Sequence, residues 1–297
     1  MQCKEWLIFL MFKILFIGIG NMGFPMAGYL SKCNEVTVYN RSKEKIDKWL
    51  STYNGKSIRS LSEINKEYDF VISCIGNDKD LCDITISENG CLDQLKENSI
   101  FIDHSTVSPK LVLKLEESFA ERKVNFLDAP ISGGQSGAEN GTLSIMVGGN
   151  KQSFIRSEEV LKSYGKKIKF MGSPGSGQLT KITNQICIAG LIQGLSEAIY
   201  FMKQTNLCPD DVLDVISSGA AQSWQMENRF KTMVDNEFDF GFAVDLMRKD
   251  LSITFDQAKE YGIDLEITKI VDDFYSEIQK MGGNKYDTSS LVKRLTS

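Results

Sequence analysis

Histidine and paired cysteines are what this sequence of 297 residues most clearly lacks. It contains one histidine, His104, and seven cysteines that are scattered singly without a CxxC pair. A structural zinc site usually needs four cysteine and histidine ligands at close spacing, so we expect no structural zinc and no other bound metal ion. The scattered spacing also shows no disulfide framework, which favours reduced thiols and a cytoplasmic location.

An excess of positive charge is missing as well. Lys and Arg total 34 against 39 Asp and Glu, which gives a formal net charge of -5. Phosphate backbones and anionic membranes select basic surfaces. We therefore expect neither nucleic acid nor a membrane as a partner. The sequence also shows no internal repeat, so we do not expect a solenoid fold.

The N-terminal segment, residues 1–12, carries an unbroken apolar run from Trp6 to Phe12. A secretory signal peptide would end in a small-residue cleavage site, which this segment lacks, and the run is too short to cross a bilayer. We interpret the segment as an N-terminal extension. Its first ten residues are dispensable if Met11 is the biological start.

The first half of the chain alternates short apolar runs with amphipathic stretches, which is the pattern of βα units in a parallel sheet. The expected strands lie at residues 13–17, 35–39, 70–75, 99–102, 124–127, 143–147 and 167–170. The expected helices lie at residues 22–31, 43–50, 81–86, 109–122 and 151–164. From about residue 178 onward apolar residues recur at spacings of three and four, so the remainder is predicted to be helical.

These patterns, with 42% hydrophobic residues for a sizeable core, predict an α/β fold in two domains. An N-terminal Rossmann-type dinucleotide-binding domain is expected at residues 13–174. A long helix joins it to an all-helical C-terminal domain at residues 175–297, which we expect to serve substrate binding and oligomerisation.

A glycine-rich turn follows the first expected strand and opens the first expected helix. Gly18, Gly20 and Gly23 form a GxGxxG pattern with Asn21 and Met22 between them. In this context the first glycine permits a tight turn, the second lets a pyrophosphate approach the backbone, and the third lets the helix pack on the sheet. All five residues are predicted to bind a dinucleotide at the helix N-terminus.

The end of the second expected strand indicates which dinucleotide is bound. An NAD-specific site usually has an acidic residue there for the ribose 2′-hydroxyl, whereas this chain has Asn40, Arg41 and Ser42. A guanidinium and a hydroxyl suit a 2′-phosphate, because charge-assisted contacts favour phosphate over a neutral hydroxyl. The pattern favours NADP as the cofactor, with NAD possible; the alternative is that Arg41 is a solvated residue at a helix start.

Five blocks of sequence resemble the β-hydroxyacid dehydrogenases, the group that contains 3-hydroxyisobutyrate dehydrogenase and several semialdehyde reductases. The blocks are FIGIGNMGFPMA from Phe16, DHSTVSP from Asp103, DAPISGGQSGAENGTLSIMVGG from Asp128, GSGQLTKITNQ from Gly175, and RKDL from Arg248. The resemblance implies reversible hydride transfer between NAD(P) and a small 3-hydroxy acid or its semialdehyde. A glyoxylate or succinic semialdehyde reductase of the same family is the alternative, and a non-catalytic nucleotide-binding module is a more distant one.

The resemblance also implies roles for individual residues. Lys181 is the expected general acid and base, and the expected substrate contacts are Ser132, Gly133, Gly134, Asn184, Gln185 and Phe242. Further cofactor contacts are expected at Ile75, Gly76, Thr106 and Lys249. His104 lies at a variable position of its block, so we do not expect it to be the base.

Four points stay open from the sequence. The family commonly has Asn where this chain has Gln185, so either Asn184 or Gln185 could orient the substrate. Relatives often have proline in place of Gly76 and asparagine in place of Asp80, and an acidic residue there would face a cofactor phosphate poorly. The family is generally oligomeric through its helical domain, so a homodimer or homotetramer is expected, but the particular hydroxy acid is not determined.

Overall fold

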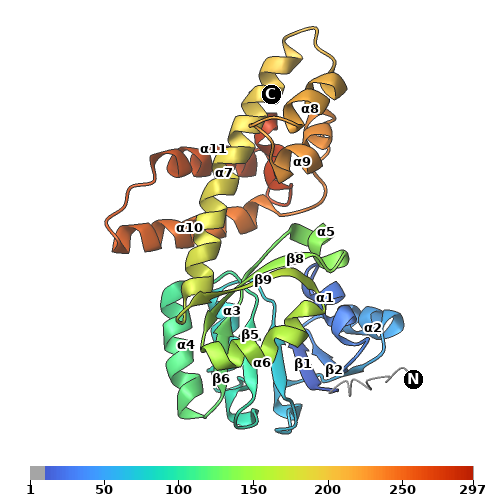
Figure 1. Ribbon diagram of the computed structural model, residues 1–297, viewed down its shortest axis with the longest axis vertical. Helices are drawn as coiled ribbons and strands as arrows, with labels where there is room; N and C mark the ends of the chain where they lie inside the picture. The colour runs from blue at the N-terminus through green and yellow to red at the C-terminus, as the bar shows by residue number, and fades with distance from the viewer. Residues whose placement is uncertain (1–10, 297) are drawn as a thin grey trace, which may run out of the picture. The chain divides into compact units, whose positions relative to one another are not determined.

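The chain divides between Lys181 and Ile182 into two compact units, and each is described by itself (Figure 1). The computed structural model describes residues 11–296, so most of the predicted N-terminal extension lies outside the described residues. The division falls inside the long helix α7 (Ser176–Lys203). The boundary predicted from the sequence, between residues 174 and 175, precedes that helix.

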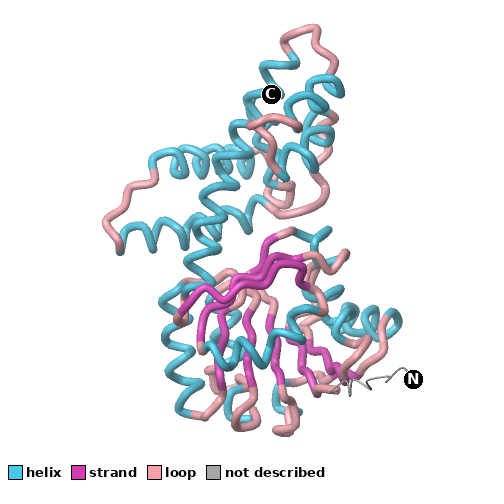
Figure 2. The backbone as a smooth tube through the Cα atoms, in the orientation of Figure 1, coloured by secondary structure: helices cyan, strands magenta, loops and turns pink. Residues whose placement is uncertain are grey.

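The first unit contains one nine-stranded sheet (Figure 2). Its strands are β1 (Lys13–Ile17), β2 (Glu35–Tyr39), β3 (Lys56–Ser57), β4 (Phe70–Ser73), β5 (Ile100–Asp103), β6 (Asn125–Asp128), β7 (Ile131–Ser132), β8 (Leu143–Gly149) and β9 (Gly165–Gly172). Their order is β3-β2-β1-β4-β5-β6-β8-β7, and β9 pairs with β8. The pairs from β3 to β6 are parallel, which confirms the predicted Rossmann-type sheet.

The sheet departs from a parallel arrangement beyond β6. Strand β8 runs antiparallel to β6 and to β7, while β9 runs parallel to β8. The runs at 143–147 and 167–170 were predicted as strands, but β3 and β7 were not, because two residues carry no periodic signal. The antiparallel extension brings Ile131 and Ser132 of β7 against β8 at the edge of the sheet.

The central strands are buried on both faces, as their continuous apolar runs require. Along β1, Ile14 and Phe16 belong to one hydrophobic cluster, whereas Leu15 and Ile17 belong to another. Successive side chains of a strand point to opposite faces, so the two clusters lie on the two faces of the sheet. All four side chains are at most 1% exposed.

The helices of the first unit connect these strands. They are α1 (Gly23–Leu30), α2 (Lys43–Thr52), α3 (Asp78–Thr85), α4 (Pro109–Glu121), α5 (Gly134–Glu139) and α6 (Lys151–Lys162), with two 3-10 turns, η1 (Leu61–Glu63) and η2 (Leu92–Gln94). Asn77, Ser108 and Asn150 cap α3, α4 and α6, because each side chain accepts a hydrogen bond from a backbone N–H of the first turn. The α3 helix therefore begins three residues earlier than its apolar periodicity predicts.

The second unit is helical, as predicted, with one isolated β-bridge between Ala243 and Asp287. After the start of α7 its elements are α8 (Pro209–Ser217), α9 (Trp224–Val234), α10 (Val244–Glu260), α11 (Glu266–Lys280), η3 (Thr288–Val292) and α12 (Lys293–Thr296). One cluster joins Ala189 and Ile192 of α7 to α10 and α11, and a second joins Leu195 and Ile199 to α9.

Helix α7 has the length and apolar composition of a membrane span, with a mean hydropathy of 1.3 over its most apolar window. However, 44% of that window is buried inside the protein, and α7 supplies residues to both hydrophobic clusters of the second unit. We interpret its apolar character as that of a core helix.

Candidate active site

The strand order places the cofactor end of the first unit between β1 and β4. In open α/β sheets, ligands bind beyond the carboxyl ends of the strands where the strand order reverses. Gly18 follows β1 with φ +93°, and a Cβ there would lie 2.4 Å from the carbonyl oxygen of Cys74. A Cβ on Gly23 would lie 2.1 Å from the carbonyl oxygen of Gly18. Both positions therefore require glycine, the first for its conformation and the second for close packing.

The space beside Gly20 differs from that beside its two partners. A Cβ at Gly20 would meet no described atom within 4 Å, so the backbone is open to a ligand there. Helix α1 has no side-chain cap among the described residues, which leaves N–H groups of its first turn for an anion. Asn21 is exposed and Met22 half-buried at this turn. These features fit the pyrophosphate of an NAD(P) cofactor.

The predicted selectivity residues lie directly after β2. The side chain of Arg41 is 80% exposed, and its Nη1 forms an ion pair with Oδ1 of Asp80 at 3.0 Å. Asn40 donates from Nδ2 to the carbonyl oxygen of Ser42 at 3.3 Å, and the Ser42 hydroxyl donates to Glu44 at 2.7 Å. The segment is thus folded into a compact turn, with the guanidinium directed away from it toward Asp80.

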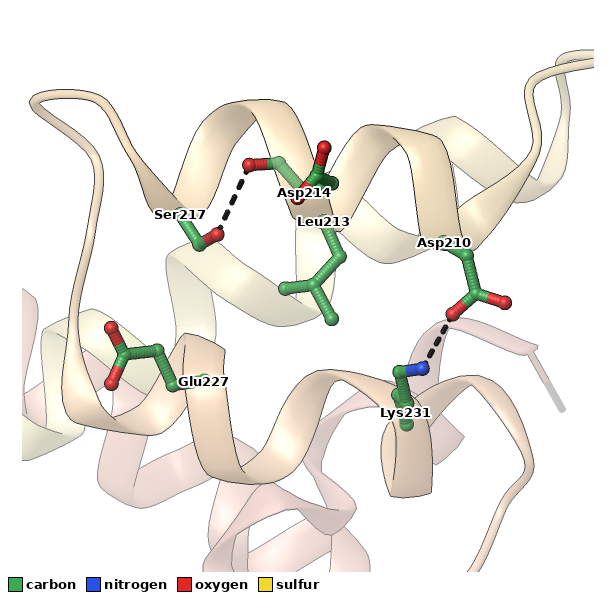
Figure 3. Close-up of a pocket in the computed structure, with 6 residues that line it drawn as sticks. All are labelled: Asp210, Leu213, Asp214, Ser217, Glu227 and Lys231. Atoms are coloured by element: carbon green, nitrogen blue, oxygen red, sulfur yellow. Dashed lines mark hydrogen bonds and ion pairs between the residues drawn. The ribbon is translucent and has the colours of Figure 1, made fainter.

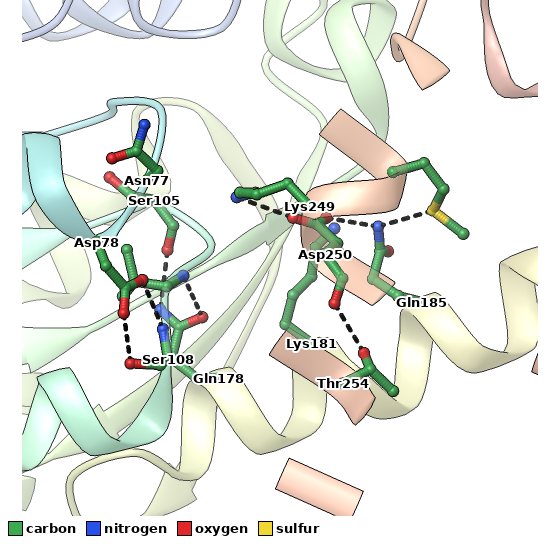
Figure 4. A network of polar contacts seen from close by, with 12 residues as sticks. Asn77, Asp78, Ser105, Ser108, Gln178, Lys181, Gln185, Lys249, Asp250 and Thr254 are labelled. Atoms are coloured by element: carbon green, nitrogen blue, oxygen red, sulfur yellow. Dashed lines mark hydrogen bonds and ion pairs between the residues drawn. The ribbon is translucent and has the colours of Figure 1, made fainter. Parts of the chain in front are cut away.

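Two loops at the carboxyl ends of β4 and β5 are tied together. The N–H of Ile75 donates to the hydroxyl of Ser105 at 3.0 Å. Asp78 accepts from both the N–H and the hydroxyl of Ser108, at 2.9 and 2.5 Å (Figure 4). The two bonds link the start of α3 to the start of α4. Ile75, a predicted cofactor contact, is thereby held beside the loop that contains Thr106.

Gln178, on the first turn of α7, fixes the position of the Thr106 loop. Its Nε2 donates to the carbonyl oxygen of Ser105 at 2.8 Å, and its Oε1 accepts from the N–H of Val107 at 3.2 Å. One carboxamide therefore satisfies the backbone on both sides of half-buried Thr106. The loop after β5 and the start of α7 form one hydrogen-bonded unit.

Asp128, at the end of β6, caps the start of α7. Its carboxylate accepts from the N–H groups of Gly175 and Gln178, each at 2.9 Å. Burial raises the pKa of Asp128 to about 7, against the lowering effect of the two backbone donors. A Cβ on Gly148 or on Gly177 would collide with Asp128, so these glycines allow the close approach.

Lys181 lies on the second turn of α7 and is only 7% exposed. Its Nζ donates to the carbonyl oxygen of Ile131 at 3.0 Å. Ile131 is the residue of β7 that precedes Ser132, and Gly133 and Gly134 follow with φ values of +126° and +60°. Within the first unit, the structure therefore brings the predicted catalytic lysine to the strand that ends at Ser132, the first of the predicted carboxylate-binding residues.

His104 has both ring nitrogens engaged inside the first unit. Because a carbonyl oxygen only accepts, Nδ1 donates to Ala129, at 2.6 Å, and Nε2 accepts from the Tyr164 hydroxyl at 2.8 Å. Burial lowers the pKa of His104 to about 4. These contacts give the imidazole a structural role that joins β5 to the segment after β6.

In the second unit, Gln185 belongs to a buried polar network (Figure 4). Its Nε2 donates to Oδ2 of Asp250 at 2.7 Å, its Oε1 accepts from Nδ2 of Asn184 at 2.8 Å, and it is 1% exposed. Lys249 pairs with the other oxygen of Asp250 at 2.9 Å. Asn184 is half-buried. Of the two alternatives left open by the sequence, Gln185 is thus committed to internal contacts.

Phe242, the predicted aromatic contact, is positioned by a buried carboxylate. Its N–H donates to Oδ2 of Asp287 at 2.9 Å. Arg229 pairs with Asp287 at 3.2 Å, and its guanidinium carbon lies 4.9 Å from the ring centres of Trp224 and Phe240. The backbone at Phe242 is therefore anchored within the helical unit.

A separate hollow of about 430 Å³ lies between α8 and α9 (Figure 3). It is lined by Asp210, Leu213, Asp214, Ser217, Glu227 and Lys231. The lining includes none of the predicted site residues, and its lysine is paired with Asp210 at 2.6 Å. No group of three or more potential metal ligands is found there or elsewhere in residues 11–296.

Comparison with known proteins matches both units over nearly the full chain. Residues 13–172 match the family described as the NAD binding domain of 6-phosphogluconate dehydrogenase, and residues 175–295 match that described as NAD-binding of NADP-dependent 3-hydroxyisobutyrate dehydrogenase. The chain belongs to the 3-hydroxyisobutyrate dehydrogenase family. It is an NAD(P)-dependent oxidoreductase of the 3-hydroxyacid dehydrogenase type, which confirms the resemblance seen in the five sequence blocks.

Three members of the family illustrate the similarity. An uncharacterised oxidoreductase of Shewanella frigidimarina is 47% identical, over 96% of this chain and 98% of its own. The 2-hydroxy-3-oxopropionate reductase of Escherichia coli is 31% identical, over 95% and 96%. The solved structure of Mycobacterium tuberculosis 3-hydroxyisobutyrate dehydrogenase with L-serine is 25% identical with a TM-score of 0.85, over 97% and 100%.

Sequence reasoning missed the residues that position the family motifs. Asp128 and Gln178 lie inside the family motifs, but the sequence predicts no role for them or for Asp287. The signal available for Asp128 was its place at the end of a buried strand, where a carboxylate can accept backbone N–H groups. No comparable signal existed for Gln178, because its partners lie about 70 residues earlier in the chain.

Proposed function

We propose that the protein catalyses the reversible oxidation of a small 3-hydroxy acid to its semialdehyde, with NADP as the preferred cofactor. Support for the substrate class comes from the relatives, one named for 3-hydroxyisobutyrate and one for 2-hydroxy-3-oxopropionate. Support for NADP comes from exposed Arg41, because the three residues that directly follow β2 are Asn40, Arg41 and Ser42 and none of them is acidic.

The observation that carries the proposal is the position of Lys181. Its buried ammonium is held by the carbonyl oxygen of Ile131 at 3.0 Å, next to Ser132. When bound, the nicotinamide would accept or supply the hydride. Lys181 as the neutral amine takes the proton from the substrate hydroxyl during oxidation, and as the ammonium it gives that proton to the alkoxide oxygen during reduction. The bond to Ile131 fixes the ammonium for this transfer.

We assign the substrate carboxylate to Ser132, Gly133 and Gly134. Gly133 and Gly134 have positive φ values of +126° and +60° and carry no side chain, so a carboxylate can approach their backbone N–H groups closely. Asn184, one turn of α7 after Lys181, is assigned to the substrate hydroxyl. Gln185 and Asp250 then hold the Asn184 carboxamide in orientation.

The test measures loss of NADPH and NADH absorbance with a panel of carboxylate-bearing semialdehydes, using wild type and Lys181→Ala. We expect turnover by wild type and a loss of about 100- to 10,000-fold in kcat in the variant, the usual contribution of general acid-base catalysis. Lys203→Ala is the matched control, because Lys203 lies on the same helix and donates to a carbonyl oxygen of Val234 at 2.7 Å. A Lys181→Ala enzyme within tenfold of wild type contradicts the assignment.

A further inference from the structure

The ion pair between Arg41 and Asp80 joins two segments that are 39 residues apart at the cofactor end of the sheet. Arg41 follows β2, while Asp80 lies in the first turn of α3, the helix that follows β4. The proposed function gives Arg41 the 2′-phosphate of NADP. The Arg41 guanidinium therefore has two possible partners, the carboxylate of Asp80 and the 2′-phosphate of the cofactor.

The two partners differ in freedom. The Arg41 side chain is 80% exposed, whereas that of Asp80 is 18% exposed. Asn77 donates from Nδ2 to Oδ2 of Asp80 at 3.2 Å and accepts from its N–H at 2.9 Å. An acidic residue in the first turn of a helix is also stabilised by the helix dipole. Asp80 is therefore held in place, and Arg41 is the partner that can move.

A glycine of the loop before α3 lies beside this carboxylate. A Cβ on Gly76 would lie 2.9 Å from Oδ2 of Asp80, which is closer than side chains normally approach. The glycine and the acid thus fit each other. The negative charge at position 80 is a built feature of the loop.

We propose that Asp80 determines cofactor specificity by weakening the binding of the 2′-phosphate of NADP while leaving NAD binding nearly unchanged; this inference rests on the proposed function. An exposed ion pair is weak, so Arg41 can contact the phosphate. The Asp80 carboxylate still repels the phosphate dianion, which would lie on the other side of the Arg41 guanidinium. NAD has a neutral hydroxyl at this place and experiences no such repulsion. The protein consequently uses both cofactors, with a moderate preference for NADP.

The expected size of the effect follows from Coulomb's law. A dianion held about 7 Å from a carboxylate in a largely aqueous setting at low ionic strength is weakened roughly three- to tenfold in affinity. Removal of the charge in Asp80→Asn should strengthen NADPH binding by that factor and change NADH binding by less than about twofold. The ratio of the NADPH affinity to the NADH affinity, called the affinity ratio below, is therefore the quantity that reports on Asp80.

The test is a titration of NADPH and of NADH, followed by cofactor fluorescence, on wild type, Asp80→Asn and Asp83→Asn. Asp83 is the matched control, because it lies on the same helix and pairs with Lys79 at 2.5 Å. Its substitution should leave the affinity ratio within about twofold. Asp80→Ser gives the same charge change with a smaller side chain if Asp80→Asn is poorly folded, and thermal melting of each variant shows whether it is folded.

The outcomes separate this inference from the proposed function. An affinity ratio that rises in Asp80→Asn or Asp80→Ser, but not in Asp83→Asn, supports the role of Asp80. A ratio that is unchanged or falls overturns it, while the wild type still binds both cofactors and turns over. Arg41→Ala should lower the ratio, and an unchanged ratio there also overturns the inference. If wild type binds neither cofactor, the proposed function fails together with it.

Discussion

Acidification should destabilise the protein through its one histidine. His104 is 2% exposed, and its pKa is lowered by burial from an ordinary value of 6.5 to about 4. Between these two values the unfolded chain binds a proton and the folded chain does not. The free energy of unfolding therefore falls as the pH is lowered from 6.5 toward about 4, and the contribution of His104 is fully present only above 6.5.

The size of this effect can be worked out from the shift. From pH 6.5 down to about pH 5, a span of about 1.5 pH units, the histidine is protonated in the unfolded chain but not in the folded chain. Each pH unit lowers the free energy of unfolding by about 1.4 kcal/mol. His104 should then cost about 2 kcal/mol of stability at about pH 5 relative to about pH 7.5. The loss has a structural cause, since a second ring proton takes from Nε2 the lone pair that accepts the Tyr164 hydroxyl.

The assay is urea unfolding of wild type and His104→Asn at both pH values. In the variant an Asn Nδ2 can still donate to Ala129, but the Tyr164 hydroxyl loses its partner, which costs about 1–3 kcal/mol at neutral pH. The stability difference between the two proteins should narrow by about 2 kcal/mol on acidification, because only wild type carries the titrating imidazole. Groups that titrate in both proteins cancel from the difference.

Two observations would refute this reasoning. One is a stability difference that stays constant or widens at the lower pH. The other is a direct titration of the folded protein by NMR in which the one imidazole protonates near its ordinary pKa of 6.5. Either result means that the ring is not held neutral by burial.

Two further predictions concern the glycine turn and the α7 cap. Gly23→Ala should lower the free energy of unfolding by about 1–3 kcal/mol, because its Cβ would overlap the carbonyl oxygen of Gly18. Gly20→Ala should change it by less than about 0.5 kcal/mol yet weaken NADPH binding. Equal effects of the two substitutions in thermal melting would contradict this distinction. Asp128 has a raised pKa of about 7, so its contribution is lost as the pH rises through that value. The stability of wild type relative to Asp128→Asn should therefore grow by about 2.5 kcal/mol from about pH 8 to about pH 5 in urea unfolding, and no growth would mean that Asp128 titrates normally.

Local patterns were sufficient to predict the longer strands of the sheet and its glycine turn. Strands β1 and β2 begin and end where the apolar runs predict, and φ at Gly18 is the left-handed value that a tight turn needs. The reason is physical, because a strand buried on both faces must be apolar throughout. A turn that approaches a neighbouring backbone must likewise lack a Cβ.

Contacts between distant segments could not be predicted in this way. Asp128 meets Gly175 across 47 residues, and Gln185 meets Asp250 across 65. Neither pair has a spacing that hydrophobic periodicity can detect, since each depends on how complete elements pack. The sequence also does not show that Gln185 is buried and bonded to both Asn184 and Asp250.

The Arg41–Asp80 pair has an evolutionary consequence. Codons for Asp and Asn differ by one base, so a single mutation at position 80 removes the carboxylate while keeping a side chain of nearly the same shape. In the proposed scheme, one such step strengthens the preference of the protein for NADP over NAD. A lineage carrying this loop could follow changes in its redox metabolism without altering the lysine or the substrate residues.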